Sequence, residues 1–140
     1  MTFSIGQRAV VADASVAIRM LLGTPDWIAA WAEWLREGSL ILVPAHFGHE
    51  VANGLLRSAR IGEAQTVAAL AKLAEIGIEV ADRGFTRIAT SVLLAERHRL
   101  TVYDASYLEL AIDVDAELAT LDRQLAAAAE AEGVALAVST

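Results

Sequence analysis

The sequence predicts an α/β domain with a mostly parallel central sheet. Short apolar or β-branched runs alternate with longer segments of helical periodicity, which is typical of repeated strand and helix units. The first run, residues 9–12, is apolar throughout, as expected for a strand covered on both faces. A length of 140 residues without a recognisable linker or repeat predicts one domain spanning residues 1–140.

The order of the predicted elements follows from hydrophobic runs, helix caps and breakers. We expect strands at residues 9–12, 40–43, 78–80, 117–121 and 134–138, and helices at residues 14–22, 25–37, 45–60, 63–75, 86–98, 105–112 and 123–132. In the helix at 86–98, periodicity predicts that Ile88, Val92 and Ala95 face inward.

Three tryptophans lie at helical spacing within residues 25–37. Trp27, Trp31 and Trp34 are four and three residues apart, which places their indoles on one stripe of the helix. We expect this stripe to pack in the core, and a partner-binding groove is the alternative.

Composition restricts the chemistry that this chain can perform. It has no cysteine, which excludes disulfides and thiolate zinc sites and leaves carboxylates and imidazoles as metal ligands. The net charge of −7 differs from the basic character of most nucleic-acid binders, although cations held by clustered acids would reverse the local field. The longest uncharged run, Gly38 to His49, is too short to span a membrane, and no signal peptide is recognisable, so we expect a cytoplasmic protein.

Three aspartates lie where strands end or helices begin. Asp13 and Asp122 directly follow predicted strands, and ligand sites of parallel sheets form beyond the carboxyl ends of the strands. Asp104 begins the predicted helix at 105–112 in a similar way. Each aspartate also suits a helix N-cap, so capping and ligand binding both remain open for all three.

Glu50 differs because it lies inside the predicted helix at 45–60. It flanks the apolar stripe formed by Phe47, Val51 and Leu55. Gly54 follows one turn later, and glycine in a helix costs about 1 kcal/mol relative to alanine. We therefore expect a compensating gain at Gly54, such as room for an ion or a phosphate beside Glu50.

Four segments in order resemble the signature segments of PIN-domain VapC toxins, the toxin halves of type II toxin–antitoxin systems. The resemblance extends from residue 9 to residue 125. The four segments are Val10-Val11-Ala12-Asp13-Ala14-Ser15, Glu50-Val51-Ala52-Asn53-Gly54-Leu55, Tyr103-Asp104-Ala105-Ser106-Tyr107 and Ala119-Thr120-Leu121-Asp122-Arg123-Gln124-Leu125.

The resemblance implies a PIN-like three-layer α/β/α domain with metal-dependent endoribonuclease activity. It implies that four acids converge and bind Mg²⁺ or Mn²⁺, and that Ser15 and Thr120 lie beside the first and last of them as donors or water contacts. These four acids are Asp13, Glu50, Asp104 and Asp122. It also implies hydrolysis of RNA to 5′-phosphate and 3′-hydroxyl products, inhibition by a VapB-like antitoxin, and a homodimer.

Physical chemistry explains why such a cluster would need a cation. Two carboxylates about 4 Å apart repel by roughly 4 kcal/mol at an effective dielectric constant near 20, so four together are unfavourable without one. Mg²⁺ prefers oxygen ligands and can lower the pKa of a bound water.

Ten of the eleven basic residues are arginine, a side chain suited to bidentate phosphate contacts. Arg19, Arg57 and Arg123 lie near the predicted acids in the sequence and are our candidates for contacts with RNA phosphates. The identity of the RNA is not encoded in any motif that we recognise.

Other classes fit less well. His46, His49 and Glu50 superficially resemble a zinc-protease helix, but the two histidines are three rather than four residues apart. Phosphoaspartate enzymes carry a second aspartate where Ser15 stands, and receiver domains need adjacent acids and a late lysine. The remaining alternative is a catalytically silent α/β module that binds a partner through the tryptophan stripe and uses its aspartates only as caps.

Overall fold

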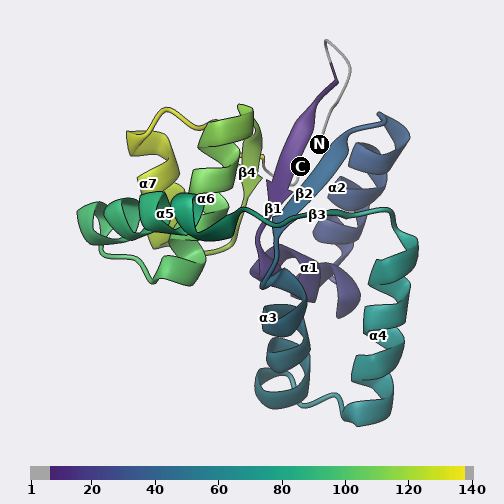
Figure 1. Cartoon of the computed structure of the whole chain (residues 1–140). Coiled ribbons are helices and arrows are strands. Elements are labelled where there is room, and N and C mark those ends of the chain that lie inside the picture. Colours follow the sequence, from purple (N-terminus) through teal and green to yellow (C-terminus); the bar gives the residue numbers. More distant parts are fainter. Residues whose placement is uncertain (1–6, 138–140) are drawn as a thin grey trace.

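The centre of the molecule is a parallel sheet. The structure, a computed structural model, describes residues 7–137. Within that range four strands pair side by side in the order β3-β2-β1-β4, and all three pairings are parallel (Figure 1). The strands are β1 (Ala9–Ala12), β2 (Leu40–Pro44), β3 (Glu79–Ala81) and β4 (Glu117–Ala119).

The fifth strand predicted at residues 134–138 is reduced to a single parallel bridge between Leu118 and Leu136. Val138 itself lies outside the described residues. The turn after the last helix brings the chain back beside β4, where Leu118 donates to Ala135 and accepts from Ala137. Pairing therefore occurs at the predicted place but over a shorter stretch.

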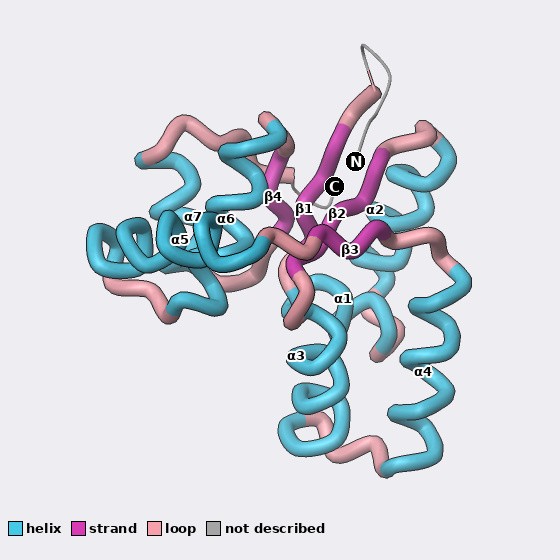
Figure 2. The backbone as a smooth tube through the Cα atoms, viewed as in Figure 1, coloured by secondary structure: helices cyan, strands magenta, loops and turns pink. Residues whose placement is uncertain are grey.

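Helices cover both faces of the sheet. Figure 2 shows α5, α6 and α7 on one side of the strands and α1 and α2 on the other. The described helices are α1 (Ala14–Leu21), α2 (Pro25–Arg36), α3 (Phe47–Asn53), α4 (Glu63–Glu75), α5 (Gly84–His98), α6 (Val102–Val114) and α7 (Arg123–Ala131), with a π-helical turn η1 (Gly54–Ser58). This arrangement confirms the three-layer α/β/α prediction.

The core lies between the sheet and these two helical layers. Every residue of β1 is buried, as its apolar run predicts. On α6, Tyr107, Leu108 and Leu110 are fully buried. The tryptophan stripe of α2 also packs inward, because Trp27, Trp31 and Trp34 are only 7%, 2% and 3% exposed. A partner-binding groove made of these indoles is therefore wrong.

The inward face of α5 differs from the one that periodicity predicts. Ala95 is buried as expected, but Ile88 and Val92 are 45% and 48% exposed. Two arginines at the start of α5 explain the rotation: the N-cap residue Arg83 contacts Glu109 of α6 at 3.2 Å, and Arg87 contacts Glu109 at 3.5 Å. Asp113, one turn later on α6, contacts both arginines as well. Because these ion pairs face α6, Ile88 and Val92 are turned toward the surface.

Helix α6 begins at Val102, three residues before the predicted start. Thr101 is its N-cap, and the Thr101 hydroxyl accepts a hydrogen bond from the backbone N–H of Asp104 at 3.1 Å. Val102 and Tyr103 thus belong to the first turn of the helix. Asp104 lies in the first turn and is not a cap, so that interpretation is wrong for this residue.

Helices α3 and α4 extend beyond the carboxyl ends of the strands as an antiparallel pair (Figure 1). No helix within residues 7–137 combines the length and the apolar character needed to cross a bilayer.

Candidate active site

Asp13 occupies the carboxyl end of β1 and is 6% exposed. Its carboxylate caps α1 by accepting from the N–H of Ser15 at 3.3 Å, and it also accepts from the hydroxyls of Ser15 and Thr120. Burial raises the pKa of Asp13 and outweighs these hydrogen bonds, and the charge of Asp104 raises it further. Asp13 is therefore a carboxylate that is costly to ionise unless a positive charge joins it.

Asp122 follows β4 and caps α7. Its side chain accepts from the N–H groups of Gln124 at 2.8 Å and Leu125 at 3.2 Å. The N–H of Asp122 donates to the hydroxyl of Thr120 at 3.0 Å. Because Thr120 also donates to Asp13, one hydroxyl links the acids that follow β1 and β4. The capping interpretation thus holds for Asp13 and Asp122 without removing either from the site.

Asp104 approaches the same edge of the sheet from α6. Burial raises the pKa of Asp104, the cap contact with Thr101 opposes that shift, and the charges of Asp122 and Glu50 raise it again. The neighbouring His46 lowers it. Asp104 thus has a raised pKa in the first turn of α6.

Glu50, one turn into α3, is held by two donors. The hydroxyl of Tyr107 donates to Glu50 Oε1 at 2.7 Å, and His46 Nε2 lies 3.1 Å from the same oxygen. Burial pushes the pKa of Glu50 upward, but the hydrogen bonds and charge of His46, together with Tyr107, bring it below its ordinary value. Of Asp13, Glu50 and Asp104, Glu50 is the acid at which contacts from other side chains outweigh the effect of burial on the pKa.

The four acids therefore share one electrostatic neighbourhood at the carboxyl edge of the sheet. Asp104 is coupled to Asp13, Asp122 and Glu50 through their charges. The Thr120 hydroxyl links Asp13 to Asp122, and the Tyr107 hydroxyl links Glu50 to the helix that carries Asp104.

The donor chemistry of this neighbourhood suits a hard divalent cation. All four groups offer oxygen, and two of them have raised pKa values that a cation would reverse. Within residues 7–137, no three histidine or acidic side chains stand close enough together to form a complete ligand set. Mg²⁺ commonly takes one or two carboxylates and keeps several waters, so the residues present fit that mode of binding.

Gly54 has a different role from the one its sequence position suggests. A β-carbon built on Gly54 would lie 2.4 Å from Ile18 Cδ1, so the missing side chain admits a side chain of α1. Ile18 thus occupies the space directly beside Gly54, and both residues line the cavity that Ser15 and Asp122 also line. The helix also changes there from α to π geometry, and the single predicted helix at 45–60 becomes α3 and η1.

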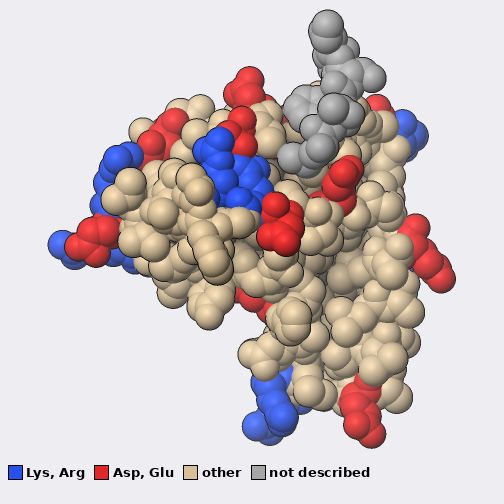
Figure 3. Space-filling view, viewed as in Figure 1, with Lys and Arg blue, Asp and Glu red and all other residues tan. Residues whose placement is uncertain are grey.

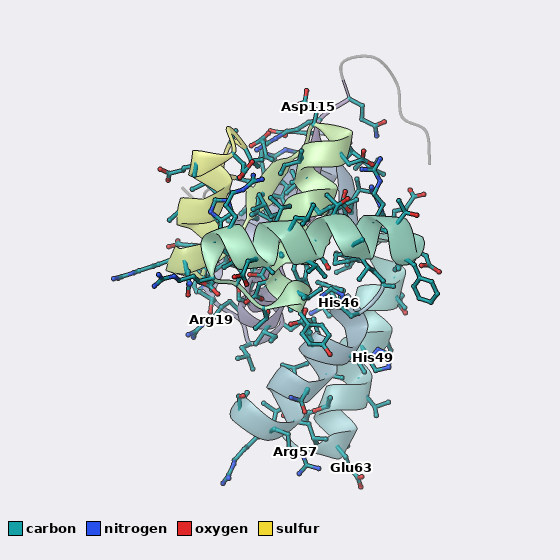
Figure 4. All side chains as sticks on the ribbon, turned by 60° about the vertical axis from the view of Figure 1, so that its left-hand side comes forward. Arg19, His46, His49, Arg57, Glu63 and Asp115 are labelled. Atoms are coloured by element: carbon teal, nitrogen blue, oxygen red, sulfur yellow. The ribbon has the colours of Figure 1, made fainter. Side chains whose placement is uncertain are left out.

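The candidate phosphate contacts separate in space. Arg19 lines a cavity of about 610 Å³ together with Asp122 and Ser15, next to the acids. Arg57 lies at the far end of the α3 region, close to Glu63 and away from His46 (Figure 4). Arg123 is exposed and does not line that cavity.

The surface charges on the face drawn in Figure 3 form small groups of both signs instead of one continuous basic area. Of Arg19, Arg57 and Arg123, Arg19 is the one that lines the cavity beside Asp122.

Two residues at the site were not predicted as part of it. Tyr107 is fully buried on α6, and its hydroxyl reaches Glu50. His46 is considered only as a zinc ligand by its sequence neighbourhood. Helical spacing is the signal that could have identified both residues. His46 lies four residues before Glu50, and Tyr107 lies three residues after Asp104, so the members of each pair share one face of a helix.

The zinc interpretation is also disfavoured by the surroundings of His46. Its Nε2 lies 3.1 Å from Glu50 Oε1 and 3.2 Å from the carbonyl oxygen of Tyr103. Both neighbours accept hydrogen bonds, so Nε2 carries a proton and is not a free ligand atom.

The fold and the acidic edge define a class, and the sequence comparison names it. Residues 10–131 match the PIN domain family, and the chain belongs to that family. Within it, the relatives are VapC-type proteins. Ribonuclease VapC3 of Mycobacterium tuberculosis is 36% identical over 126 residues, which cover 85% of this chain and 86% of VapC3.

Solved structures share the same fold. VapC20 of Mycobacterium tuberculosis, described as a toxin that cleaves the sarcin-ricin loop, superposes with a TM-score of 0.69 at 18% identity over 85% of this chain and 94% of its own. VapBC2 of Rickettsia felis, solved with a DNA fragment of its promoter, gives a TM-score of 0.70 at 14% identity over 94% and 99%. At these identities the similarity concerns the fold alone.

Proposed function

We propose that this chain is a divalent-metal-dependent endoribonuclease and the toxin of a toxin–antitoxin pair. Its proposed site comprises Asp13, Glu50, Asp104 and Asp122, with Mg²⁺ or Mn²⁺ as the cofactor. The observation that carries the proposal is the position of these acids at one edge of the sheet, where the Thr120 hydroxyl links Asp13 to Asp122 and the Tyr107 hydroxyl ties Glu50 to the helix that carries Asp104. Curated relatives of this chain are named ribonucleases, which supports the same activity.

The protein's own contribution is to hold these acids in place. Ser15 and Thr120 fix the carboxylate of Asp13, and Thr120 also contacts the backbone of Asp122. We propose that these two hydroxyls keep the acids oriented toward the substrate phosphate. A bound divalent cation would supply charge neutralisation and an acidic water for phosphodiester hydrolysis, which would leave 5′-phosphate and 3′-hydroxyl ends.

Arg19 is the proposed phosphate contact, because it lines the cavity that Asp122 also lines. A guanidinium there would bind an RNA phosphate beside the acids and would partly offset the net charge of −7 that this chain presents to RNA. Arg57 and Arg123 remain weaker candidates on the same proposal.

The proposed partners are RNA, a VapB-like antitoxin and a second copy of the chain, all in the cytoplasm. The antitoxin would block the acidic edge. The exposed side chains of Phe85, Ile88 and Leu93 on α5 offer apolar surface for self-association. Light scattering of the purified chain tests the homodimer, and a monomer at micromolar concentration would contradict it.

Cleavage of RNA by the antitoxin-free protein tests the activity. We expect cleavage of total RNA with Mg²⁺ and none with chelator. Asp13→Asn should lower the rate by about 10²–10³, since removing a group that stabilises developing charge costs that much. Asparagine still caps α1, so the loss would not come from unfolding.

A matched control is Asp26→Asn, which removes an exposed acid in the first turn of α2. We expect that variant to cleave RNA like the unaltered chain. Equal cleavage by the unaltered chain, by Asp13→Asn and by the chelated sample would end the enzyme proposal and leave a partner-binding module. Sequencing of the cleaved ends after induced expression would identify the RNA target.

A further inference from the structure

The two oxygens of Glu50 are in different situations. Oε1 receives both the Tyr107 hydroxyl, at 2.7 Å, and His46 Nε2, at 3.1 Å. Within the described part of the chain, no hydrogen bond or ion pair reaches Oε2. The Glu50 side chain is 32% exposed, so solvent ions have access to it. One oxygen is thus held by the protein while the other is open.

Both donors are themselves fixed by their surroundings. Tyr107 is fully buried on α6, one turn after Asp104. The imidazole of His46 packs edge-on against two rings, with centroids 5.4 Å from Tyr103 and 5.3 Å from Tyr107. Figure 4 shows His46 near the N-terminal end of α6. The two donors therefore tie Glu50 of α3 to the helix that carries Asp104.

The proton on His46 has a defined place. Glu50 Oε1 and the Tyr103 carbonyl oxygen both accept hydrogen bonds, so Nε2 carries a proton. His46 therefore donates toward Glu50, as Tyr107 does. The Tyr107 hydroxyl and His46 Nε2 both donate to Glu50 Oε1, so neither atom competes with Glu50 for a cation.

We propose that Tyr107 and His46 are positioning residues that hold Glu50 through Oε1 and present Oε2 to the divalent cation. The proposal rests on the metal-dependent function proposed above. A free glutamate side chain loses rotamer freedom when it binds an ion, and these two contacts remove part of that freedom beforehand. Contacts of this kind to a metal ligand change metal affinity by about 10- to 100-fold when they are lost.

Titration of the full-length, antitoxin-free chain with Mn²⁺, followed by the electron paramagnetic resonance signal of the free ion, tests this proposal. Tyr107→Phe and His46→Leu each remove one donor to Oε1, and we expect each to weaken Mn²⁺ binding by about 10-fold or more. His46→Gln keeps an N–H donor near the Nε2 position and should recover most of the loss. A role confined to packing would not distinguish glutamine from leucine in this way.

Tyr103→Phe is the matched control, because it removes an exposed hydroxyl from the same helix while keeping the ring against His46. We expect its Mn²⁺ affinity to equal that of the unaltered chain. Unaltered affinity in both Tyr107→Phe and His46→Leu would overturn the positioning roles while leaving the nuclease proposal intact. Failure of the unaltered chain to bind Mn²⁺ would instead reject the metal-dependent function, and the positioning roles with it. If the buried Tyr107 variant does not fold, the two variants of the partly exposed His46 still give the answer.

Discussion

Asp13 caps a helix and also belongs to the proposed site. Its Oδ1 accepts the N–H of Ser15, while Oδ2 accepts two hydroxyls. Burial nevertheless raises the pKa of Asp13, as it does for Asp104. Glu50 has the opposite shift because His46 and Tyr107 both contact it. Ionisation of Asp13 or Asp104 therefore destabilises the folded state, whereas ionisation of Glu50 stabilises it.

The opposite shifts predict opposite effects of neutral substitutions on the metal-free protein. The folded-state pKa of Asp104 lies above its ordinary 3.8, so its contribution to stability is present below that pH and lost as pH rises through the raised pKa. The folded-state pKa of Glu50 lies below its ordinary 4.5, so its contribution is present above that pH and lost as pH falls through the lowered pKa. Near neutral pH, Asp104→Asn should raise the Tm by about 2–4 °C, and Glu50→Gln should lower it by a similar amount.

Thermal unfolding in chelator between about pH 4 and pH 8 measures both effects. Asp104→Asn should gain most at the upper end of this range, where the unaltered Asp104 is ionised. A lower Tm for Asp104→Asn at neutral pH would show that neither the burial of the ionised Asp104 nor repulsion from the other acids destabilises the folded state.

At the scale of the elements, local signals determine where helices start and tertiary contacts determine how they rotate. Pro25 occupies the first turn of α2 as predicted. By contrast, the rotation of α5 follows from the ion pairs that Arg83 and Arg87 make with α6. Glu109 is 3% exposed, and burial raises its pKa against the charges of both arginines. A buried acid needs such partners, so this contact outweighs the apolar periodicity of the helix.

The close contact between α1 and α3 predicts a coupling between Gly54 and Ile18. Gly54→Ala improves helix propensity by about 1 kcal/mol but adds a β-carbon beside Ile18 Cδ1. Ile18→Val removes that terminal carbon. In the Ile18→Val background, Gly54→Ala should therefore be more favourable than in the unaltered chain by about 1 kcal/mol.

Urea unfolding of the four proteins in this double-mutant cycle gives the coupling free energy. Additive effects of the two substitutions would show that the Ile18 side chain moves aside at no cost. The space beside Gly54 would then need another explanation.

At the scale of the whole molecule, the sheet brings together acids that are far apart in sequence. Parallel strands end at one edge, so the residues that follow β1 and β4 meet there, and α3 and α6 add Glu50 and Asp104. On the proposed function, cations at this edge would reverse the local field that an RNA phosphate meets on an acidic chain. Stability and cation binding are then linked for the entire domain.

Cation binding should therefore stabilise the folded protein as a whole. A ligand at 100 times its Kd adds about 2.7 kcal/mol, so saturating Mg²⁺ or Mn²⁺ should raise the Tm by several degrees. The double variant Asp13→Asn with Asp104→Asn should lose most of this increase. Differential scanning calorimetry at equal ionic strength, with Na⁺ as the control salt, measures the effect. A Tm that does not respond to either divalent cation would count against the metal site.

The sequence by itself determined the class of fold and the strand-to-helix junctions. Alternating apolar runs and helix caps are local signals, so β1, α2 and α4 lie within a residue or two of their predicted bounds. Asp13 and Asp122 could be placed after strands for the same reason. Their neighbourhood with Glu50 and Asp104 was predicted only through the resemblance of four short segments to one family.

Only the tertiary structure decided which atoms meet between elements. The contact of Tyr107 with Glu50 joins residues 57 positions apart, and no local periodicity encodes it. The insertion of Ile18 beside Gly54 and the rotation of α5 are of the same kind, because each depends on how two helices pack. Local sequence sets the conformation of the chain over a few residues, whereas contacts between distant residues form only when the sheet and its helices have assembled.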